Sequence, residues 1–564
     1  MRTAGPIAEW LVLAAQHDLV LRRKQAMFER VLAERRKWRM SESNAGSESS
    51  APSASSASEY DEIPYPSGPI RHTHPCSLAA VPLLFDIQPA VPAQARVLEL
   101  GCAAGGNLMP MAQDLPGARF LGIDLSSRQI ADGLSQLQRL PLDNLELRQL
   151  DIADVNREVG EFDYIICHGV YSWVPRPIQD KILAIGREQL AQNGILYVSY
   201  NTFPGWHFRG VVRDMMRYHV TSFASPQERI SQARSLLDFL VHAADSGSEA
   251  YRIVLAEEAK ILASQSDAYL YHEHLEEVNE PLYFSEFVQR ATAAGLQYLG
   301  EVEFPMMLHG NFEEATAAIL AQASFLRQEQ YMDFLRARSF RCSLLCHGEL
   351  RPSRVIQPTR LNALHLSLAE PLDLIGCDLD SHEEVEWSIL GGTISTCLPV
   401  IKHALAALAK RFPGAMAMQE LADRALSASA GRLADRQRIE SDMLTMVSKG
   451  VLRAMVDPPG FVSRSGPHPQ ATPLARDQAA QGLPVTSRLH ESLQLDPVSR
   501  WLLPQLNGQV SQAQLVSLFR TAVRNGQFQV SSEGRSLSEL DDASCQQVVQ
   551  HSLSTLAGNA LLVG

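Results

Sequence analysis

The chain has 564 residues, which is too long for a single hydrophobic core and predicts several domains. Hydrophobic residues make up 45% of the sequence and charged residues 20%, which excludes collagen-like and wholly disordered chains. A net charge of -13 disfavours general binding to nucleic-acid phosphates or anionic lipid. The N-terminal apolar run, residues 10–15, is too short to span a bilayer, and the eight cysteines lack metal-type spacing. We expect a cytoplasmic protein with reduced thiols and no membrane insertion.

The first 59 residues differ in composition from the rest of the chain. Residues 1–40 have the pattern of an amphipathic helix with a basic second half, and residues 41–58 are mostly Ser, Ala, Gly and Pro. A segment of the second composition cannot bury enough apolar surface to offset the entropy of the chain. We therefore predict an N-terminal helix and a disordered linker over residues 1–59.

From residue 95 onward, short β-rich segments alternate with helical ones. Strands are expected at residues 95–100, 118–123, 144–150, 162–168 and 194–200. This alternation predicts an α/β fold with a Rossmann-like parallel sheet. Right-handed crossovers then place helices on both faces and bring the carboxyl ends of the strands to one edge, where such sheets bind ligands.

After residue 200 the alternation stops, and residues 207–280 read as a helical insertion with a regulatory role. Helix and strand resume up to residue 304, with Gly295 as a helix C-cap, and a strand at 339–347 closes a domain that we place at 60–350. Three helices flanked by strands predict a winged-helix-like domain at 351–457. A linker rich in Pro, Gly, Ser and Gln follows at 458–482, and a small, mostly helical domain at 483–564.

The strongest chemical signal is VLELGCAAGGNL, residues 97–108, in which a strand runs through a glycine-rich turn into a helix. Gly101 permits a tight turn, and Gly105 lets the backbone approach a ligand at a helix N-terminus. The next strand ends at Asp124, which is placed to bind both hydroxyls of a ribose. The third strand ends at Asp151 and Ile152, a polar and apolar pair that suits the amino group and ring of adenine.

A carboxylate beside the turn distinguishes between two cofactors. A nicotinamide dinucleotide shares the ribose carboxylate but needs a turn that carries a pyrophosphate. Glu99 instead suits the ammonium group of S-adenosylmethionine. We predict S-adenosylmethionine as cofactor, bound by residues at the ends of the first four strands: Glu99, Gly101, Cys102, Gly105, Asn107, Asp124, Leu125, Asp151, Ile152 and His168.

Structural roles remain open for some of these residues. Asp at the end of a strand commonly caps the next helix, so Asp124 and Asp151 have that alternative. The thiol of Cys102 is expected to pack as a small apolar group, because methyl transfer from a sulfonium needs no nucleophile from the enzyme.

Two loops rich in aromatic residues follow the fourth and fifth strands, at 167–175 and 199–207. One interpretation is a channel for a long amine, in which ring faces stabilise the positive charge that forms on nitrogen. The alternative is that the rings pack under the helical insertion. The candidate catalytic residues on these loops are Tyr171, Trp173, Tyr200, Trp206 and His168.

The sequence HTHPC brings His72, His74 and Cys76 close together ahead of the first strand. It lacks the spacing and the second cluster of a structural zinc site, so we predict no metal. The segment is expected to fold over the cofactor instead, with Tyr65 and His74 in a lid or in simple packing.

Several longer segments surround the glycine turn: YDEIPYPSGPIRHTHP before it, and GNLMPMAQDLPGARFLGIDLS, ICHGVYSWVP, YVSYNTFPGWHFRGVVRDMM and YHEHLEEVNEPLYFSEFVQRA after it. Together they resemble class I S-adenosylmethionine-dependent methyltransferases with a methyltransferase regulatory domain, a family that includes bacterial protein-lysine N-methyltransferases. The resemblance covers residues 60–350 strongly and 351–564 loosely. Two departures are the GCAAGG turn, where many relatives have Gly or Asp in the middle, and the residues before Glu59, which have no recognised counterpart.

The resemblance implies methyl transfer to lysine side chains of a protein substrate. The lysine amine must first lose a proton, through water, Tyr171, Tyr200 or His168, and no single general base is assigned. A methyltransferase for small molecules or other macromolecules is the alternative within enzymes. A nucleic-acid-binding regulator that senses the cofactor is a further alternative, which the near balance of charge over residues 385–460 disfavours. The sequence leaves the oligomeric state open.

Overall fold

The structure is a computed structural model that describes residues 63, 65–243, 248–389, 392–429, 431, 435–528, 531–532, 535–536 and 541–564. All elements below belong to the unit Ala57–Gly564. The N-terminal helix and linker predicted for residues 1–59 lie outside the described residues. No helix among the described residues is both long enough and apolar enough to cross a bilayer.

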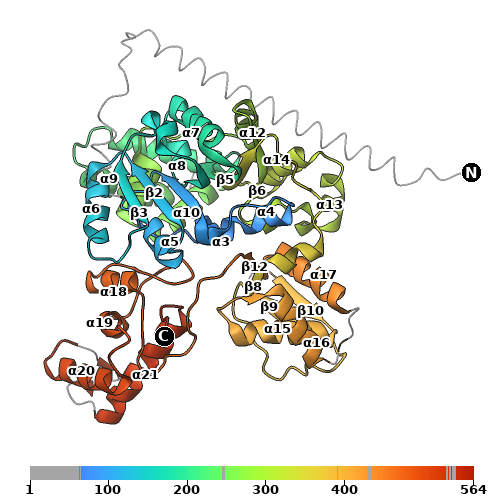
Figure 1. Cartoon of the computed structure of the whole chain (residues 1–564). Coiled ribbons are helices and arrows are strands. Elements are labelled where there is room, and N and C mark those ends of the chain that lie inside the picture. The colour runs from blue at the N-terminus through green and yellow to red at the C-terminus, as the bar shows by residue number, and fades with distance from the viewer. Residues whose placement is uncertain are drawn as a thin grey trace, which may run out of the picture. The chain divides into compact units, whose positions relative to one another are not determined.

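A seven-stranded sheet has the order β3-β2-β1-β4-β5-β7-β6. Figure 1 labels β2, β3, β5 and β6 of this sheet. Its strands are β1 (Arg96–Leu100), β2 (Arg119–Asp124), β3 (Leu145–Gln149), β4 (Phe162–Cys167), β5 (Leu190–Asn201), β6 (Leu296–Glu301) and β7 (Phe340–His347). The first five are parallel, and β7 pairs antiparallel with both β5 and β6. The predicted Rossmann-like sheet is confirmed, with the carboxyl ends of β1 to β5 on one edge.

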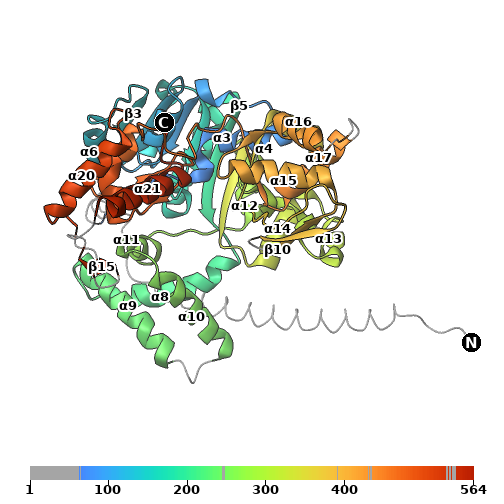
Figure 2. The same cartoon turned by 90° about the horizontal axis from the view of Figure 1, so that it is seen from below.

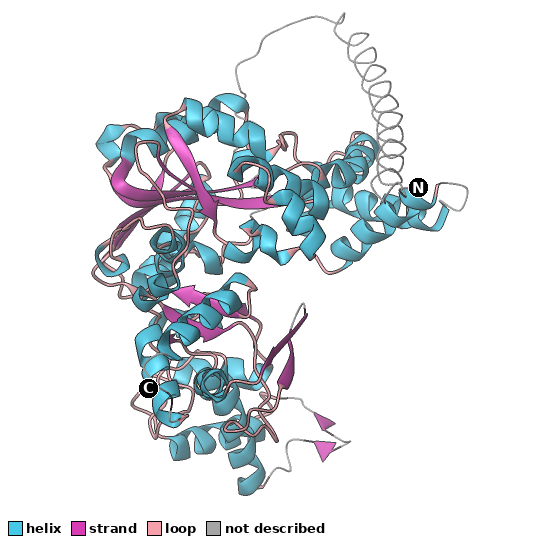
Figure 3. Ribbon diagram, turned by 90° about the vertical axis from the view of Figure 1, so that its right-hand side faces the viewer, coloured by secondary structure: helices cyan, strands magenta, loops and turns pink. Residues whose placement is uncertain are grey.

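Helices cover both faces of this sheet (Figure 3). They include α3 (Pro75–Leu78), α4 (Ala80–Leu84), α5 (Leu108–Asp114), α6 (Ser127–Leu137), α7 (Arg176–Gln189) and α12 (Phe284–Ala293). Alternate residues of a strand face opposite sides, so Val97 and Leu98 of β1 lie in two different buried clusters. Gly295, at φ +82°, lies between α12 and β6 as the expected helix stop.

The helical insertion has a core of its own. It consists of α8 (Gly205–Val220), α9 (Pro226–Ala243), α10 (Glu249–Ala263) and α11 (Asp267–Leu270), followed by a π-helical turn at Tyr271–Leu275. Val212, Leu255 and Leu262 are among its buried residues. Figure 2 shows α8, α9 and α10 packed against one another as a separate group.

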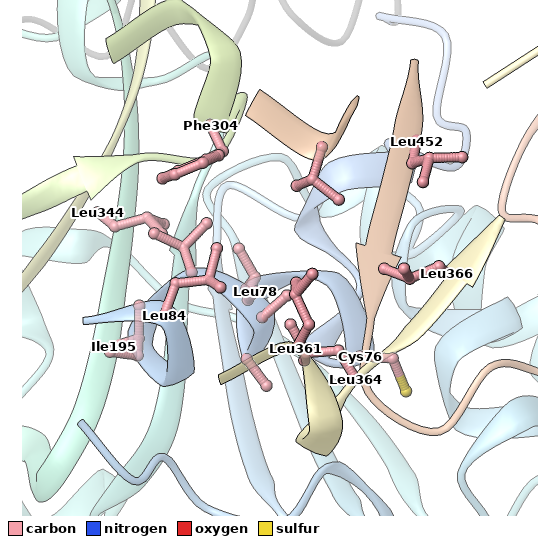
Figure 4. Close-up of a cluster of buried hydrophobic side chains, with 14 of the residues drawn as sticks. Cys76, Leu78, Leu84, Ile195, Phe304, Leu344, Leu361, Leu364, Leu366 and Leu452 are labelled. Atoms are coloured by element: carbon pink, nitrogen blue, oxygen red, sulfur yellow. The ribbon is translucent and has the colours of Figure 1, made fainter. Parts of the chain in front are cut away.

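The segment 351–457 contains the elements expected from its pattern. A small sheet has the order β11-β8-β12 and is accompanied by a β9–β10 hairpin and three helices. The bounds are β8 (His365–Leu368), β9 (Val385–Ile389), β10 (Gly392–Thr396), α15 (Pro399–Arg411), β11 (Met416–Ala417), α16 (Met418–Ala428), α17 (Asp435–Ser448) and β12 (Leu452–Met455). Its core is continuous with one face of the large sheet: Leu366 and Leu452 join the cluster that contains Leu84 and Leu344 (Figure 4).

The last part of the chain differs from the predicted linker at 458–482. It forms α18 (Pro473–Ala480), β13 (Val485–Thr486), β14 (Ser492–Leu493), α19 (Pro497–Leu502), α20 (Gln512–Arg524) and α21 (Asp542–Gly558). The Thr472 side chain accepts the Ala475 N–H and caps α18, with Pro473 at the first helical position. Leu474 and Ala475 are buried. These apolar contacts hold part of residues 458–482 in a helix, although the composition of the segment is typical of a linker.

Candidate active site

The glycine-rich turn lies at the carboxyl end of β1, where two other segments approach it closely. Gly101 and Gly105 have φ of +75° and +77°, a conformation that side chains disfavour. A Cβ on Gly101 would overlap Val170, which follows β4. A Cβ on Gly106 would lie 2.7 Å from the backbone of Ser67. Glycine at these positions therefore permits close approach by the backbone.

Asp124, at the end of β2, connects the turn to the next helix. One carboxylate oxygen accepts the Ala103 N–H at 2.8 Å and the other accepts the Ser126 N–H at 2.9 Å. The N-cap of α6 is Ser126 and not Asp124. The neighbouring Leu125 is 42% exposed, so its side chain is accessible to an adenine ring. Asp124 thus supports the turn, and its role toward a ribose stays a prediction.

Asp151 shows the structural alternative more directly. Its side chain accepts the Ala153 N–H at 2.8 Å and caps the short 3-10 helix Ile152–Asp154. Ile152 is half-buried beside it. The cap uses Oδ1 of Asp151, so Oδ2 can still accept a hydrogen bond from the adenine amino group. Binding to adenine stays a prediction.

Glu99 is a buried carboxylate behind the turn. One of its oxygens accepts the Asn107 side-chain N–H at 2.7 Å, while Oε2 is buried and has no partner among the described residues. Burial, with a smaller contribution from the Asp124 carboxylate, raises the pKa of Glu99 to about 7 even though the hydrogen bond from Asn107 opposes the shift. An unpartnered buried carboxylate oxygen matches the ammonium group of S-adenosylmethionine, so the residues present fit that cofactor.

This pKa predicts that cofactor affinity depends on pH. An ammonium favours the ionised carboxylate, so protons compete with the cofactor as the pH falls through about 7. Titration of the wild-type chain should show affinity falling by about threefold to tenfold from about pH 7.5 to about pH 6, in proportion to the ionised fraction of Glu99. Glu99→Gln should bind more weakly with a flat profile. A flat wild-type profile would contradict the prediction.

His168, directly after β4, is held by a residue that the sequence analysis did not single out. Its Nδ1 lies 2.8 Å from the Tyr197 hydroxyl, and Nε2 of His72 lies 2.9 Å from the same oxygen. Burial lowers the pKa of His168 to about 3 and that of His72 to about 4, so both rings are neutral near pH 7. Because a hydroxyl carries only one proton, at most one ring accepts from Tyr197 and at least one ring donates to it. Tyr197 could have been suspected because a buried Tyr hydroxyl usually needs a partner.

The aromatic candidates separate into two groups. Tyr171 and Tyr200 are fully buried and contact Phe287, with ring centroids 5.5 and 4.1 Å away. Tyr200 belongs to β5 and not to a loop, because β5 continues its pairing with β7 through Asn201. Both rings are therefore packed, but against α12 of the sheet core and not under the helical insertion, and their catalytic role stays a prediction.

Trp173 and Trp206 form the second group. Their rings meet edge to face with centroids 6.1 Å apart. Trp206 lies in the first turn of α8 and not in a loop, and the Arg209 guanidinium lies 4.8 Å from its ring centroid. Trp173 is only half-buried, so it has surface to offer an acceptor.

The segment before β1 crosses over the glycine turn. The Ser67 hydroxyl accepts the Gly106 N–H at 2.8 Å, and the carbonyl of Tyr65 accepts from Gln129 of α6 at 3.2 Å. His74 caps α3 by accepting the Cys76 N–H at 3.2 Å. The segment therefore lies against the glycine turn; the buried His74 fits the packing alternative, and folding over the cofactor stays a prediction.

Comparisons with known proteins agree with this geometry. Three family models match: a methyltransferase domain at 98–196, a predicted methyltransferase regulatory domain at 266–347, and the PKMT C-terminal winged helix domain at 468–561. The uncharacterized protein RP789 of Rickettsia prowazekii is 33% identical over 518 residues, covering 89% of this chain and 93% of that protein. The chain belongs to this methyltransferase family.

Solved structures agree with this assignment. PKMT2 from Rickettsia typhi has a TM-score of 0.81 and 30% identity, covering 89% of this chain and 100% of that chain. The same protein was solved in complex with AdoHcy, the demethylated product of S-adenosylmethionine, with the same similarity. The protein is therefore an S-adenosylmethionine-dependent methyltransferase, as the sequence predicts.

Two domain positions differ from the sequence interpretation. The regulatory-domain model starts within the predicted helical insertion and continues through β7, whereas the sequence pattern assigns regulation to residues 207–280. The winged-helix model matches 468–561, most of which the pattern describes as a linker and a small helical domain. Short strands such as β13 and β14 give little periodic signal, which explains why the pattern reads as mostly helical.

Proposed function

We propose that this methyltransferase acts on lysine side chains of a protein substrate. The observation that carries the proposal is the similarity to PKMT2 along nearly the whole chain, together with the PKMT winged helix domain. The name PKMT fits a protein-lysine methyltransferase. The eight cysteines are free thiols, most of them buried, which supports the proposal of a cytoplasmic location.

The cofactor residues have distinct proposed roles. When bound, S-adenosylmethionine supplies an electrophilic methyl group on a sulfonium. Glu99 would hold its ammonium with the unpartnered oxygen, and Asp124 would accept from the ribose hydroxyls. Leu125, Asp151 and Ile152 would hold the adenine, while Gly101 and Gly105 keep the turn open to close approach. Cys102 is buried, and burial raises its thiol pKa well above the usual value, which leaves it a packing residue.

Trp173 is proposed to receive the lysine side chain, and Trp206, which is 2% exposed, to hold the Trp173 ring from its buried side. Direct transfer forms an N–C bond to the methyl carbon as its S–C bond breaks, so the amine must be neutral. The Arg209 guanidinium beside Trp206 is paired with Glu258 and Glu273, so its positive charge is compensated within the helical insertion. His168 is neutral with a pKa lowered to about 3, mainly by burial, which makes it a weak proton acceptor. It is better suited to a fixed hydrogen bond than to removing the proton.

The function can be tested by labelled methyl transfer. The full chain is incubated with methyl-labelled S-adenosylmethionine and a cell lysate, proteins are separated by size, and labelled bands are hydrolysed in acid. We expect label in protein bands and methyllysine in the hydrolysate. Label confined to small molecules would favour the small-molecule alternative, and label in protein without methyllysine would exclude lysine as the acceptor.

Changing Trp173 to Ala should separate catalysis from cofactor binding. We expect kcat to fall by about tenfold or more, because the ring face near the forming cation is lost, while the cofactor Kd changes by less than about twofold. Tyr218→Ala is the matched control, since Tyr218 is an 87% exposed aromatic of α8 and should leave both constants unchanged. Weakened cofactor binding with unchanged kcat in Trp173→Ala would contradict the proposed role.

A further inference from the structure

A tight turn of the C-terminal domain contacts the methyltransferase domain behind the glycine-rich turn. Residues 487–491 connect β13 to β14, with the Ser487 N–H donating to Glu491 at 2.9 Å and the His490 N–H donating to Ser487 at 3.0 Å. His490 is 3% exposed and has φ of +58°, a left-handed conformation that costs free energy in a residue other than glycine. A buried imidazole on a strained backbone is a feature that needs an explanation.

Ionic contacts hold this turn in place on both sides. Arg488 pairs with the buried carboxylate of Asp114, the last residue of α5. Glu491 pairs with Arg71 at 2.5 Å on the segment that crosses the glycine turn. Between these two pairs, Nε2 of His490 lies 2.8 Å from Oδ1 of Asn107. The turn therefore reaches a residue that itself touches Glu99.

The orientation of the Asn107 amide is determined by its partners. The backbone N–H of Ile70 can only donate, and it lies 2.8 Å from Oδ1, so that atom is the amide oxygen. The Asn107 amide nitrogen consequently donates to Glu99 at 2.7 Å and to the Thr73 hydroxyl at 3.0 Å. Because an amide oxygen only accepts, His490 must carry its proton on Nε2.

His490 is also neutral in this position. Burial lowers its pKa well below the ordinary value, and His74, His72 and Arg71 lower it further by repulsion. Its Nδ1 is buried with no partner among the described residues. The imidazole thus acts as a single N–H donor aimed at the Asn107 oxygen.

We propose that His490 is a positioning residue for the cofactor site: its N–H fixes the Asn107 amide, which holds Glu99 in place for the cofactor ammonium. The C-terminal winged helix domain thereby contributes to methyl-donor binding from outside the methyltransferase domain. The proposal rests on the role of Glu99 proposed above. Coupling of this kind is reciprocal, so cofactor binding should in turn stabilise the turn at 487–491.

The test compares His490→Ala with His490→Gln in the full chain. Both variants keep a Cβ at the strained position. Only Gln keeps an N–H donor, on its side-chain amide, at nearly the same distance from the backbone as Nε2 of His490. Calorimetric titration with S-adenosylmethionine and AdoHcy should give a Kd about fivefold to tenfold weaker for Ala, the loss of one positioning hydrogen bond, and less than about threefold weaker for Gln. An unchanged Kd in His490→Ala, or equal weakening in both variants, would overturn the proposal.

Glu491→Gln is the matched control for domain docking. It weakens the contact with Arg71 while leaving His490 and Asn107 intact, and a partly exposed pair contributes little, so its Kd should equal that of the wild type. Weakening in Glu491→Gln as large as in His490→Ala would assign the effect to general docking and overturn the proposal.

Two further measurements separate this coupling from the role of Glu99. If Glu99→Gln leaves the Kd unchanged, the proposed role of Glu99 fails. If Glu99→Gln weakens binding but His490→Ala leaves the Kd unchanged, Glu99 retains its role and the proposed coupling to His490 fails. Hydrogen exchange on the wild-type chain needs no variant: AdoHcy should slow exchange of the amides at 487–491. Unchanged exchange there under saturating AdoHcy would contradict the reciprocal coupling.

Discussion

Replacing Asp124 with Ala should weaken S-adenosylmethionine binding by about hundredfold, the largest change in affinity expected for a single site residue. Hydrogen bonds to a charged group contribute about 1.5–3 kcal/mol each, so losing those to the ribose gives at least this factor. The variant also loses the carboxylate that accepts the Ala103 and Ser126 N–H groups. Calorimetric titration with S-adenosylmethionine measures the affinity, and thermal unfolding measures the accompanying loss of stability.

Asp124→Asn distinguishes ribose binding from support of the turn. An Asn side chain keeps one carbonyl oxygen, which can still accept the Ser126 N–H in a local turn, but it lacks the charge and the second acceptor. If Asp124 binds ribose, Asn should recover most of the stability while affinity stays low. Recovery of affinity in step with stability would instead assign Asp124 a purely structural role.

Much of the cofactor site follows from local sequence because its residues stand directly at strand ends. Glu99 and Asp124 lie in or next to buried strands and are separated by one βαβ unit, so sheet topology alone brings them to the same edge. The contacts of Asn107 are different. Its partner His490 is 383 residues away in the sequence, and no periodicity or spacing can show that the two meet.

The aromatic residues show a second limit of sequence reasoning. Tyr200 and Trp206 stand in the same nine-residue segment, yet Tyr200 lies within β5 and Trp206 within α8. What decides is the pairing of β5 with β7, a strand about 140 residues later, which extends β5 to Asn201. A segment that reads as an aromatic loop therefore contributes one ring to the sheet core and another to the insertion.

Arg341 on β7 is the centre of a buried ion cluster beside the end of β5. The side chain is fully buried and contacts Glu301 at 2.7 Å, Asp333 at 2.9 Å and Glu329 at 3.0 Å. The Ser343 hydroxyl donates to Glu301 and lies 3.2 Å from the Tyr200 hydroxyl, so the ion cluster connects to the end of β5. Burial raises the pKa of Glu329 to about 7 although Arg341 opposes the shift, so the charge of this carboxylate depends on its pairing with Arg341.

Arg341→Met should lower the free energy of unfolding by about 3–5 kcal/mol near neutral pH, because Glu329 loses its ion pair while Glu301 and Asp333 keep only Arg338. Their folded-state pKa values should then lie above the unfolded values, so stability should fall as pH rises and partly recover toward about pH 5. Urea unfolding at two pH values measures both effects. The control Arg148→Met removes an exposed pair with Glu146 and should change stability by less than about 1 kcal/mol. Equal stability of Arg341→Met and wild type would mean that desolvation cancels the attraction within the cluster.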